Sequence, residues 1–163
     1  MELNPLTALS PIDGRYARQT DALRDIFSEC AFMNARVRVE VEWLISLSEA
    51  GFAELPHLSD HGKAFLRGLA DNFSLADCEA IKEIEKTTNH DVKAVEYWIK
   101  NQVAHDEELK SASEFVHFSC TSEDINNTSH AIMLKRGREA LADYLQQIHD
   151  TIAGFAHQWA EIP

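Results

Sequence analysis

Residues 122–160 read SEDINNTSHAIMLKRGREALADYLQQIHDTIAGFAHQWA, the longest periodic stretch of the chain. Two rows of large apolar residues run through it with a seven-residue period. One row is Leu134, Leu141, Ile148 and Phe155, and the other is Leu145, Ile152 and Trp159. This is the a/d spacing of helices that pack against near-parallel partners. The stretch predicts one long helix and, with it, an all-α fold.

A helix of this length would extend about 55 Å. A compact domain made of the remaining residues would have a radius of gyration of only about 13–14 Å. The apolar stripe therefore predicts contacts with partner helices that this chain does not supply. An ordinary core helix carries a similar stripe, so that simpler interpretation stays open.

The region before this helix also reads as helical. Residues 17–50 contain no Gly or Pro and carry helically spaced apolar residues, and Gly51 follows as a helix stop. Residues 36–43 alternate like a strand. We still expect a helix there because the surrounding run lacks helix breakers and because two Arg–Glu pairs have i,i+4 spacing, Arg36–Glu40 and Arg38–Glu42.

Shorter helices fill the middle of the chain. They are expected over about 59–72, from a capping box at 74–77 to about 87–89, and over about 91–103. The pattern weakens over 104–120. The stretch up to Tyr16 contains two prolines and an Asp-Gly pair, and it reads as an irregular leader.

Charge limits the partners of this chain. It has 15 Lys and Arg against 27 Asp and Glu, a formal net charge of −12. This argues against nucleic acid or an anionic membrane as the main partner, because both require clustered cations. A small anionic ligand needs only a few local cations and remains compatible with the composition.

The cysteines and the N-terminus indicate the compartment. Cys30, Cys78 and Cys120 are far apart and form no C-x-x-C motif, which predicts reduced thiols and neither bridges nor a zinc site. The first residues lack the features of a signal peptide, and no run of eighteen apolar residues occurs. We expect a cytoplasmic protein.

The first of three polar segments is SPIDGRY at 10–16. Arg15 offers a planar fork of donors that fits phosphate or carboxylate, and Tyr16 adds a hydroxyl and a stacking face. A turn in which Arg15 merely pairs with Asp13 would explain the same residues.

The second segment is TTNHDVK at 87–93, where a helix is expected to begin. The backbone amides and positive dipole of a helix start favour an anion and disfavour protonation of His90. Lys93 would add positive charge. The alternative is simple capping by Thr88 or Asn89.

The third segment is SCTSEDINN at 119–127, which opens the long helix. Thr121 and Asp124 have capping-box spacing, which is a sufficient structural reason for both residues. The hydroxyls of Thr121 and Ser122, together with free helix-start amides, would also bind a carboxylate or phosphate.

In this order the segments resemble the bacterial-type adenylosuccinate lyases of the fumarase/aspartase superfamily. The matching strings are SPIDGRY at 10–16, EKTTNHDVKAVEY at 85–97 and FVHFSCTSEDINN at 115–127. The resemblance covers essentially the whole chain. It implies an N-terminal helical domain over residues 1–118 and, over 119–163, the start of a central helical bundle that forms a homotetramer.

The resemblance implies a β-elimination that releases fumarate from adenylosuccinate, giving AMP, and from the succinyl-carboxamide ribotide of de novo purine synthesis. The implied substrate-binding residues are Arg15 and Tyr16 at the nucleotide end, Asn89, His90 and Asp91 in the pocket, and Thr121 and Ser122 at a succinyl carboxylate. Lys93 is a further candidate. His90 is assigned to binding and orientation rather than proton transfer, and neither a cofactor nor a metal is implied.

The resemblance also implies that this chain is the N-terminal part of a longer enzyme. The family's RTHGQ segment, whose His is the general acid, and its GSSxMPxK loop, whose Ser is the general base, do not occur here. Both are expected downstream of Pro163. Because elimination needs both groups, the chain alone is expected to be inactive, and no catalytic residue is assigned.

Two other interpretations stay open. The first is another lyase of the superfamily with a non-nucleotide substrate, such as fumarate plus ammonia. The second is a non-catalytic helical module that docks partner helices through the long apolar stripe.

Overall fold

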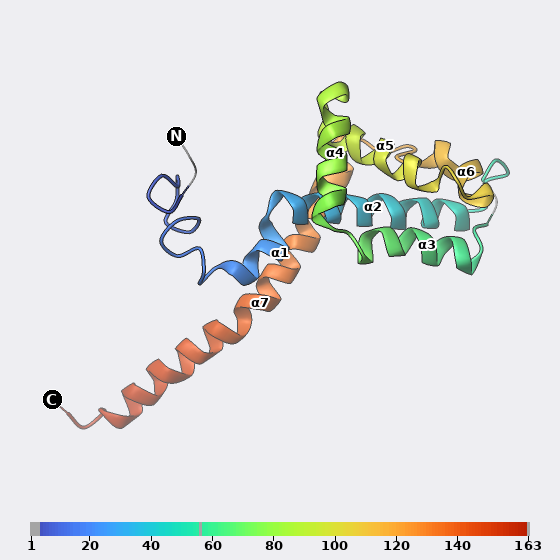
Figure 1. Cartoon of the computed structure of the whole chain (residues 1–163). Coiled ribbons are helices and arrows are strands. Elements are labelled where there is room, and N and C mark those ends of the chain that lie inside the picture. Colours follow the sequence, from blue (N-terminus) through green and yellow to red (C-terminus); the bar gives the residue numbers. More distant parts are fainter. Residues whose placement is uncertain (1–3, 56, 163) are drawn as a thin grey trace. The chain divides into compact units, whose positions relative to one another are not determined.

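The computed structural model describes residues 4–55 and 57–162, and within these ranges it is helical with no strand. The α-helices are α1 (Arg24–Phe27), α2 (Glu29–Glu49), α3 (Asp60–Asp71), α4 (Leu75–Thr88), α5 (Asp91–Val103), α6 (Glu107–Ala112) and α7 (Ser122–Gln158) (Figure 1). Two 3-10 turns, η1 (Asp21–Leu23) and η2 (Ser113–Phe115), complete the elements. The predicted all-α fold is confirmed.

The chain divides into two compact units. The larger unit is formed by Ser28–Ile132, and the smaller unit by the residues up to Phe27 together with those from Met133 onward. Helix α7 supplies residues to both units. Each unit is therefore described by itself.

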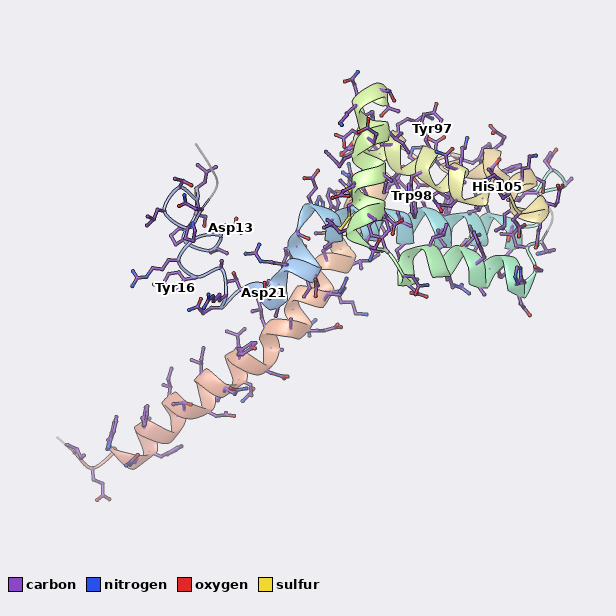
Figure 2. All side chains as sticks on the ribbon, in the orientation of Figure 1. Asp13, Tyr16, Asp21, Tyr97, Trp98 and His105 are labelled. Carbon is purple, nitrogen blue, oxygen red and sulfur yellow. A yellow bond between two sulfur atoms is a disulfide. The ribbon has the colours of Figure 1, made fainter. Side chains whose placement is uncertain are left out.

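Helix α2 is the centre of the larger unit, because α3, α4 and α5 all pack against it. Figure 1 shows α3 running alongside α2. Trp98 of α5 is buried and meets the Phe73 ring edge-on at 5.5 Å, whereas the neighbouring Tyr97 is exposed (Figure 2). The core is completed by buried aliphatic residues, among them Val37, Val41, Leu44, Leu66, Ile81, Val95, Ile99 and Leu109.

The ends of α2 follow from its capping residues. Ser28 is the N-cap, and its side chain accepts a hydrogen bond from the Ala31 N–H at 3.2 Å. This cap splits the breaker-free run into α1 and α2, which the sequence did not predict. At the other end Gly51 adopts φ +81°, the left-handed conformation that favours glycine, so the predicted stop is confirmed.

The charged residues of the strand-like alternation in α2 find their partners on other helices or in the interior of the unit. Of its two Arg–Glu pairs, neither forms the predicted i,i+4 contact. Arg38 instead pairs with Asp71, and Arg67 donates twice to the Glu42 carboxylate, at 2.8 and 2.9 Å. Arg36 and Glu40 are buried and reach into the unit. The helix was therefore predicted correctly from the breaker-free run, whereas the i,i+4 pairs given as its second reason do not form.

The shorter helices lie close to their predicted positions. Ser59 caps α3, and the Asp77 carboxylate accepts from the Ser74 N–H at 2.8 Å in the capping box of α4. Helix α5 has the expected bounds. Helix α6 lies in the stretch where the sequence pattern is weak, so its formation was not predicted.

The cysteines correct one expectation. The structure joins Cys30 and Cys78 in a disulfide with a Cα–Cα distance of 5.7 Å, and Cys120 is the free thiol. The fold packs the first turn of α2 against α4 and so brings together two residues that are 48 apart in sequence. Sequence spacing alone gave no sign of this contact.

The smaller unit holds most of α7. Gly137 lies close to the Phe27 ring, and a Cβ there would come within 2.8 Å of Phe27 Cε2. Beyond this contact the predicted stripe is exposed, with Leu145 at 65% and Ile152 at 62%. Among the described residues, no helix has the length and apolar composition to cross a membrane.

Candidate functional site

The second and third polar segments meet in the larger unit. His90 is the N-cap of α5, and Ser122 is the first residue of α7. The His90 Nε2 atom and the Ser122 hydroxyl lie 3.3 Å apart. Two helix starts, whose amides and dipoles both favour negative charge, are therefore adjacent.

The hydrogen bonds of His90 define its state. Its Nδ1 accepts from the Lys93 N–H at 3.2 Å, so this nitrogen carries no proton. In this tautomer the Nε2 N–H can be donated to Ser122 or to a ligand. His90 itself, and not Thr88 or Asn89, caps α5; Asn89 is the left-handed C-cap of α4, with φ +49°.

Asp91 is held from two sides. The Arg36 guanidinium donates to Oδ2 at 2.5 Å, and the Val92 N–H donates to Oδ1 at 2.8 Å. Burial acts to raise the pKa of Asp91, but the Val92 hydrogen bond and the charge of Arg36 lower it overall. Asp91 is therefore a fixed carboxylate that can accept a hydrogen bond from a ligand hydroxyl or amine.

The ammonium group of Lys93 is paired with a carboxylate of the protein. Its Nζ donates to the buried Glu96 at 2.8 Å and lies 5.2 Å from the centre of the Tyr97 ring. The hydrogen bond to Glu96 is the main cause of the raised pKa of Lys93. A ligand anion would have to compete with Glu96 for this ammonium group.

The start of α7 is less completely capped. The Thr121 N–H and hydroxyl both donate to Asp124 Oδ2, at 2.7 and 3.0 Å, and these bonds lower the pKa of Asp124. This is half of the predicted capping box, since the Asp124 N–H donates instead to the Thr121 carbonyl. In the described part of the chain the amides of Ser122 and Glu123 have no acceptor. They are the donors available to an anion.

The loop before α7 contacts a buried carboxyl group of α2. Glu40 of α2 is 1% exposed, and its Oε1 lies 2.6 Å from His117 Nδ1. His117 and Ser119 adopt positive φ values of 64° and 62°, which are strained for residues with a side chain. Burial, followed by the charges of Glu40 and Asp124, raises the pKa of the Cys120 thiol. Cys120 is thus a poor nucleophile.

A groove of the larger unit lies beside the start of α7, next to predicted site residues, and is not lined by them. This groove of about 470 Å³ is lined by residues of α2, the loop before α7 and α7, including Trp43, Cys120 and Ile125. None of the predicted site residues lines it. Within residues 4–55 and 57–162, no group of three or more His, Cys, Asp or Glu side chains is suited to hold a metal ion.

Arg15 and Tyr16 lie in the turn segment of the smaller unit, where Figure 2 labels Tyr16 and Asp13. Asp13 pairs with Arg24 at 3.6 Å, so the alternative that Arg15 answers Asp13 is wrong. The Arg15 guanidinium lies 5.5 Å from the centre of the Tyr16 ring. Both side chains are exposed and available to a ligand.

Sequence reasoning did not assign a role to three residues of this region: Arg36, Glu40 and His117. The sequence showed only that Arg36 and Glu40 lie one turn apart in the helix. We interpreted this pair as an i,i+4 ion pair, which would satisfy both charges within the helix. Their true partners lie 55 to 90 residues further along the chain and could not be read from α2.

Comparison with known proteins shows the family of this chain. A family model described as Lyase matches residues 14–163. Over 100% of its length the chain is 51% identical to an adenylosuccinate lyase of Vibrio cholerae serotype O1, 52% to one of Haemophilus influenzae and 50% to one of Escherichia coli K12. It spans about a third (36%) of the length of each of these curated relatives. The chain belongs to the lyase family.

Proposed function

We propose that the protein catalyses the β-elimination of fumarate from adenylosuccinate, giving AMP, and from the succinyl-carboxamide ribotide of de novo purine synthesis. The observation that carries this proposal is identity of 50–52% over the whole chain with relatives named adenylosuccinate lyase. The three polar segments lie within the compared region. A substrate with one phosphate and two carboxylates suits an acidic protein that keeps a few anion-binding points.

Each polar segment has a proposed role. Arg15 and Tyr16 bind the nucleotide end of the substrate. Asn89, His90 and Asp91 line the pocket, with the His90 Nε2–H as donor and the Asp91 carboxylate as acceptor. Thr121 and Ser122 hold a succinyl carboxylate, and the unpaired amides of Ser122 and Glu123 support this assignment because they offer two more donors.

Proton transfer is proposed to come from other residues. Elimination needs a base for the Cβ proton, an acid for the leaving nitrogen, and donors for the carboxylate dianion that forms between the two steps. We place the acid and base in the part of the relatives' length that this chain does not span. No cofactor or metal is included in the proposal.

The proposed assembly is a cytoplasmic homotetramer. The N-terminal helical domain covers residues 1–118, and the central bundle begins at 119. The exposed apolar stripe of α7 supports a bundle, because it offers an a/d surface to partner helices. The same stripe favours the alternative of a non-catalytic helical module.

Turnover of adenylosuccinate by the full-length protein tests the activity. Loss of adenylosuccinate absorbance should accompany equal amounts of AMP and fumarate, while the 163-residue chain alone should show no turnover. A preference for fumarate plus ammonia would favour another lyase of the superfamily. No turnover of any such substrate by a folded full-length protein would favour the non-catalytic module.

Arg15→Ala tests the nucleotide role. We expect this variant to weaken adenylosuccinate binding on the order of tenfold, because a charge-assisted contact is lost, and to leave fumarate binding nearly unchanged. Steady-state kinetics of the full-length protein measure the difference, from the KM for adenylosuccinate and the inhibition constant for fumarate. Arg18→Ala, another exposed Arg of the same segment, is the matched control. Equal losses for both ligands would contradict the assignment.

A further inference from the structure

We propose that Arg36 is a positioning residue that fixes the two adjacent helix starts of the candidate site relative to each other. Its substrate-level consequences rest on the proposed function. The contacts themselves do not, because they are made inside the larger unit between α2, α5 and α7.

The contacts of Arg36 are divided between the two helix starts. Its Nη2 donates to Asp91 Oδ2 at 2.5 Å, at the first residue of α5. Its Nε donates to Asn126 Oδ1 at 2.9 Å, one turn into α7. One rigid, planar guanidinium therefore sets the separation of the helix ends that carry His90 and Ser122.

The guanidinium is itself held in place. Its central carbon lies 3.8 Å from the centre of the Phe32 ring, and Phe32 stacks on His130 of α7 with ring centres 4.5 Å apart and planes at 13°. Arg36 as a whole is only 5% exposed. It is too deeply buried to bind a substrate directly and can act only through its partners.

A lysine could not replace this arrangement. A guanidinium presents donors in a fixed fork, whereas an ammonium on a flexible chain has no fixed pair of donor directions. Arg36→Lys preserves the charge opposite Asp91 but cannot satisfy Asp91 and Asn126 in one defined geometry. Arg36→Gln removes both the charge and the fork.

Steady-state kinetics and thermal unfolding of the full-length protein test the proposal. We expect Arg36→Gln to raise the KM for adenylosuccinate on the order of ten- to a hundredfold, with a smaller fall in kcat, because misplaced binding groups cost affinity first. Arg36→Lys should give an intermediate KM. Combining Arg36→Gln with Asp91→Asn should raise KM by much less than the product of the two single effects.

Two controls separate positioning from stability. Leu66→Ala, in the buried core, is expected to lower the unfolding temperature, and Arg67→Gln removes a bidentate ion pair with Glu42 that includes none of the candidate site residues. Both should keep the wild-type KM below their unfolding temperatures. If Leu66→Ala raised KM as much as Arg36→Gln, or if the effects of Arg36→Gln and Asp91→Asn simply multiplied, the proposal would be overturned.

The failure of the proposed function is recognised separately, from the wild-type protein. If that protein did not turn over adenylosuccinate, the same cycle of Arg36→Gln and Asp91→Asn would be read from unfolding temperatures. Non-additive shifts would still support the link between α2 and the start of α5. Additive shifts would overturn it.

Discussion

Glu40 is a buried residue, and only one of its two carboxyl oxygens has a hydrogen-bond partner in the described part of the chain. His117 Nδ1 pairs with Oε1, but Oε2 has no hydrogen-bond partner in the described part of the chain. Burial is the largest influence and raises the pKa of Glu40, the nearby Glu96 raises it further, and His117 opposes both. Folding therefore favours the protonated form of this residue.

Glu40→Gln tests the sign of this effect. Because the folded-state pKa of Glu40 lies above the ordinary 4.5, the folded state binds more protons than the unfolded state as pH rises past that value. Between pH 4.5 and about pH 6, where ordinary histidines stay protonated, the unfolding free energy of the wild type should fall relative to Glu40→Gln. Urea unfolding at several pH values measures it.

Glu42→Gln is the matched comparison, two residues further along α2. The hydrogen bond from Arg67 is the main cause of the lowered pKa of Glu42. The stabilisation by Glu42 is therefore present above pH 4.5 and is lost as pH falls below it. If both variants changed with pH in the same direction, the assignment of Glu40 as a carboxylate destabilised by burial would be wrong.

The residues of the candidate site fall into two groups, those placed by neighbouring residues in the sequence and those placed by contacts with distant ones. The helix starts at His90 and Ser122 were predictable, since turn and capping residues act over a few positions. The role of Arg36 was not, because its partners are Asp91 and Asn126, 55 and 90 positions away. The spacing of an Arg and a Glu along a helix does not show which distant groups will pair with each charge.

At the scale of the elements, the Cys30–Cys78 disulfide covalently links the first turn of α2 to α4. It closes a loop with a sequence separation of 48, and by the chain-entropy relation such a bridge contributes about 4 kcal/mol. We expect a reducing agent to lower the unfolding free energy by about this amount. Denaturant unfolding with and without a phosphine reductant measures the change.

Cys120→Ser is the control for the disulfide, because Cys120 is the free cysteine. It should leave the response to reductant unchanged, whereas the double variant Cys30→Ser, Cys78→Ser should abolish the response. Alkylation of the denatured, unreduced protein should label one cysteine by mass. Labelling of all three would show that the thiols are reduced, as the sequence spacing indicated.

At the scale of the elements, periodicity predicted most of the helices but not all of their ends. The apolar repeat and the N-cap residues place α3, α4, α5 and α7 close to their observed bounds. The split at Ser28 was missed because a breaker-free run hides a serine that can cap as well as continue a helix. Helix α6 was missed because it is too short to show a period.

For the whole molecule, the stripe of α7 is expected to be an assembly surface. Ile148→Glu places a charge among large apolar residues that are exposed in this chain, with Ile148 itself 56% exposed. We expect the variant to dissociate the oligomer of the full-length protein, because an unpaired charge is costly at an apolar contact. Light scattering coupled to size-exclusion chromatography reports the mass.

His157→Glu is the control on the opposite side of the same helix. It introduces the same carboxylate outside the stripe and should leave the mass unchanged. If Ile148→Glu also left the full-length protein at its wild-type mass, the stripe would not be the assembly surface. The proposed homotetramer would then need a different contact.

The position of Arg36 also has a consequence for how the chain folds. Its hydrogen bonds to Asp91 and Asn126 close loops of 55 and 90 residues, so they are gained only after much of the chain has lost its freedom. Contacts of this kind form late, after the local helices. Losing them should accelerate unfolding more than it slows folding. The candidate site would then be the last part of the larger unit to assemble and the first to come apart.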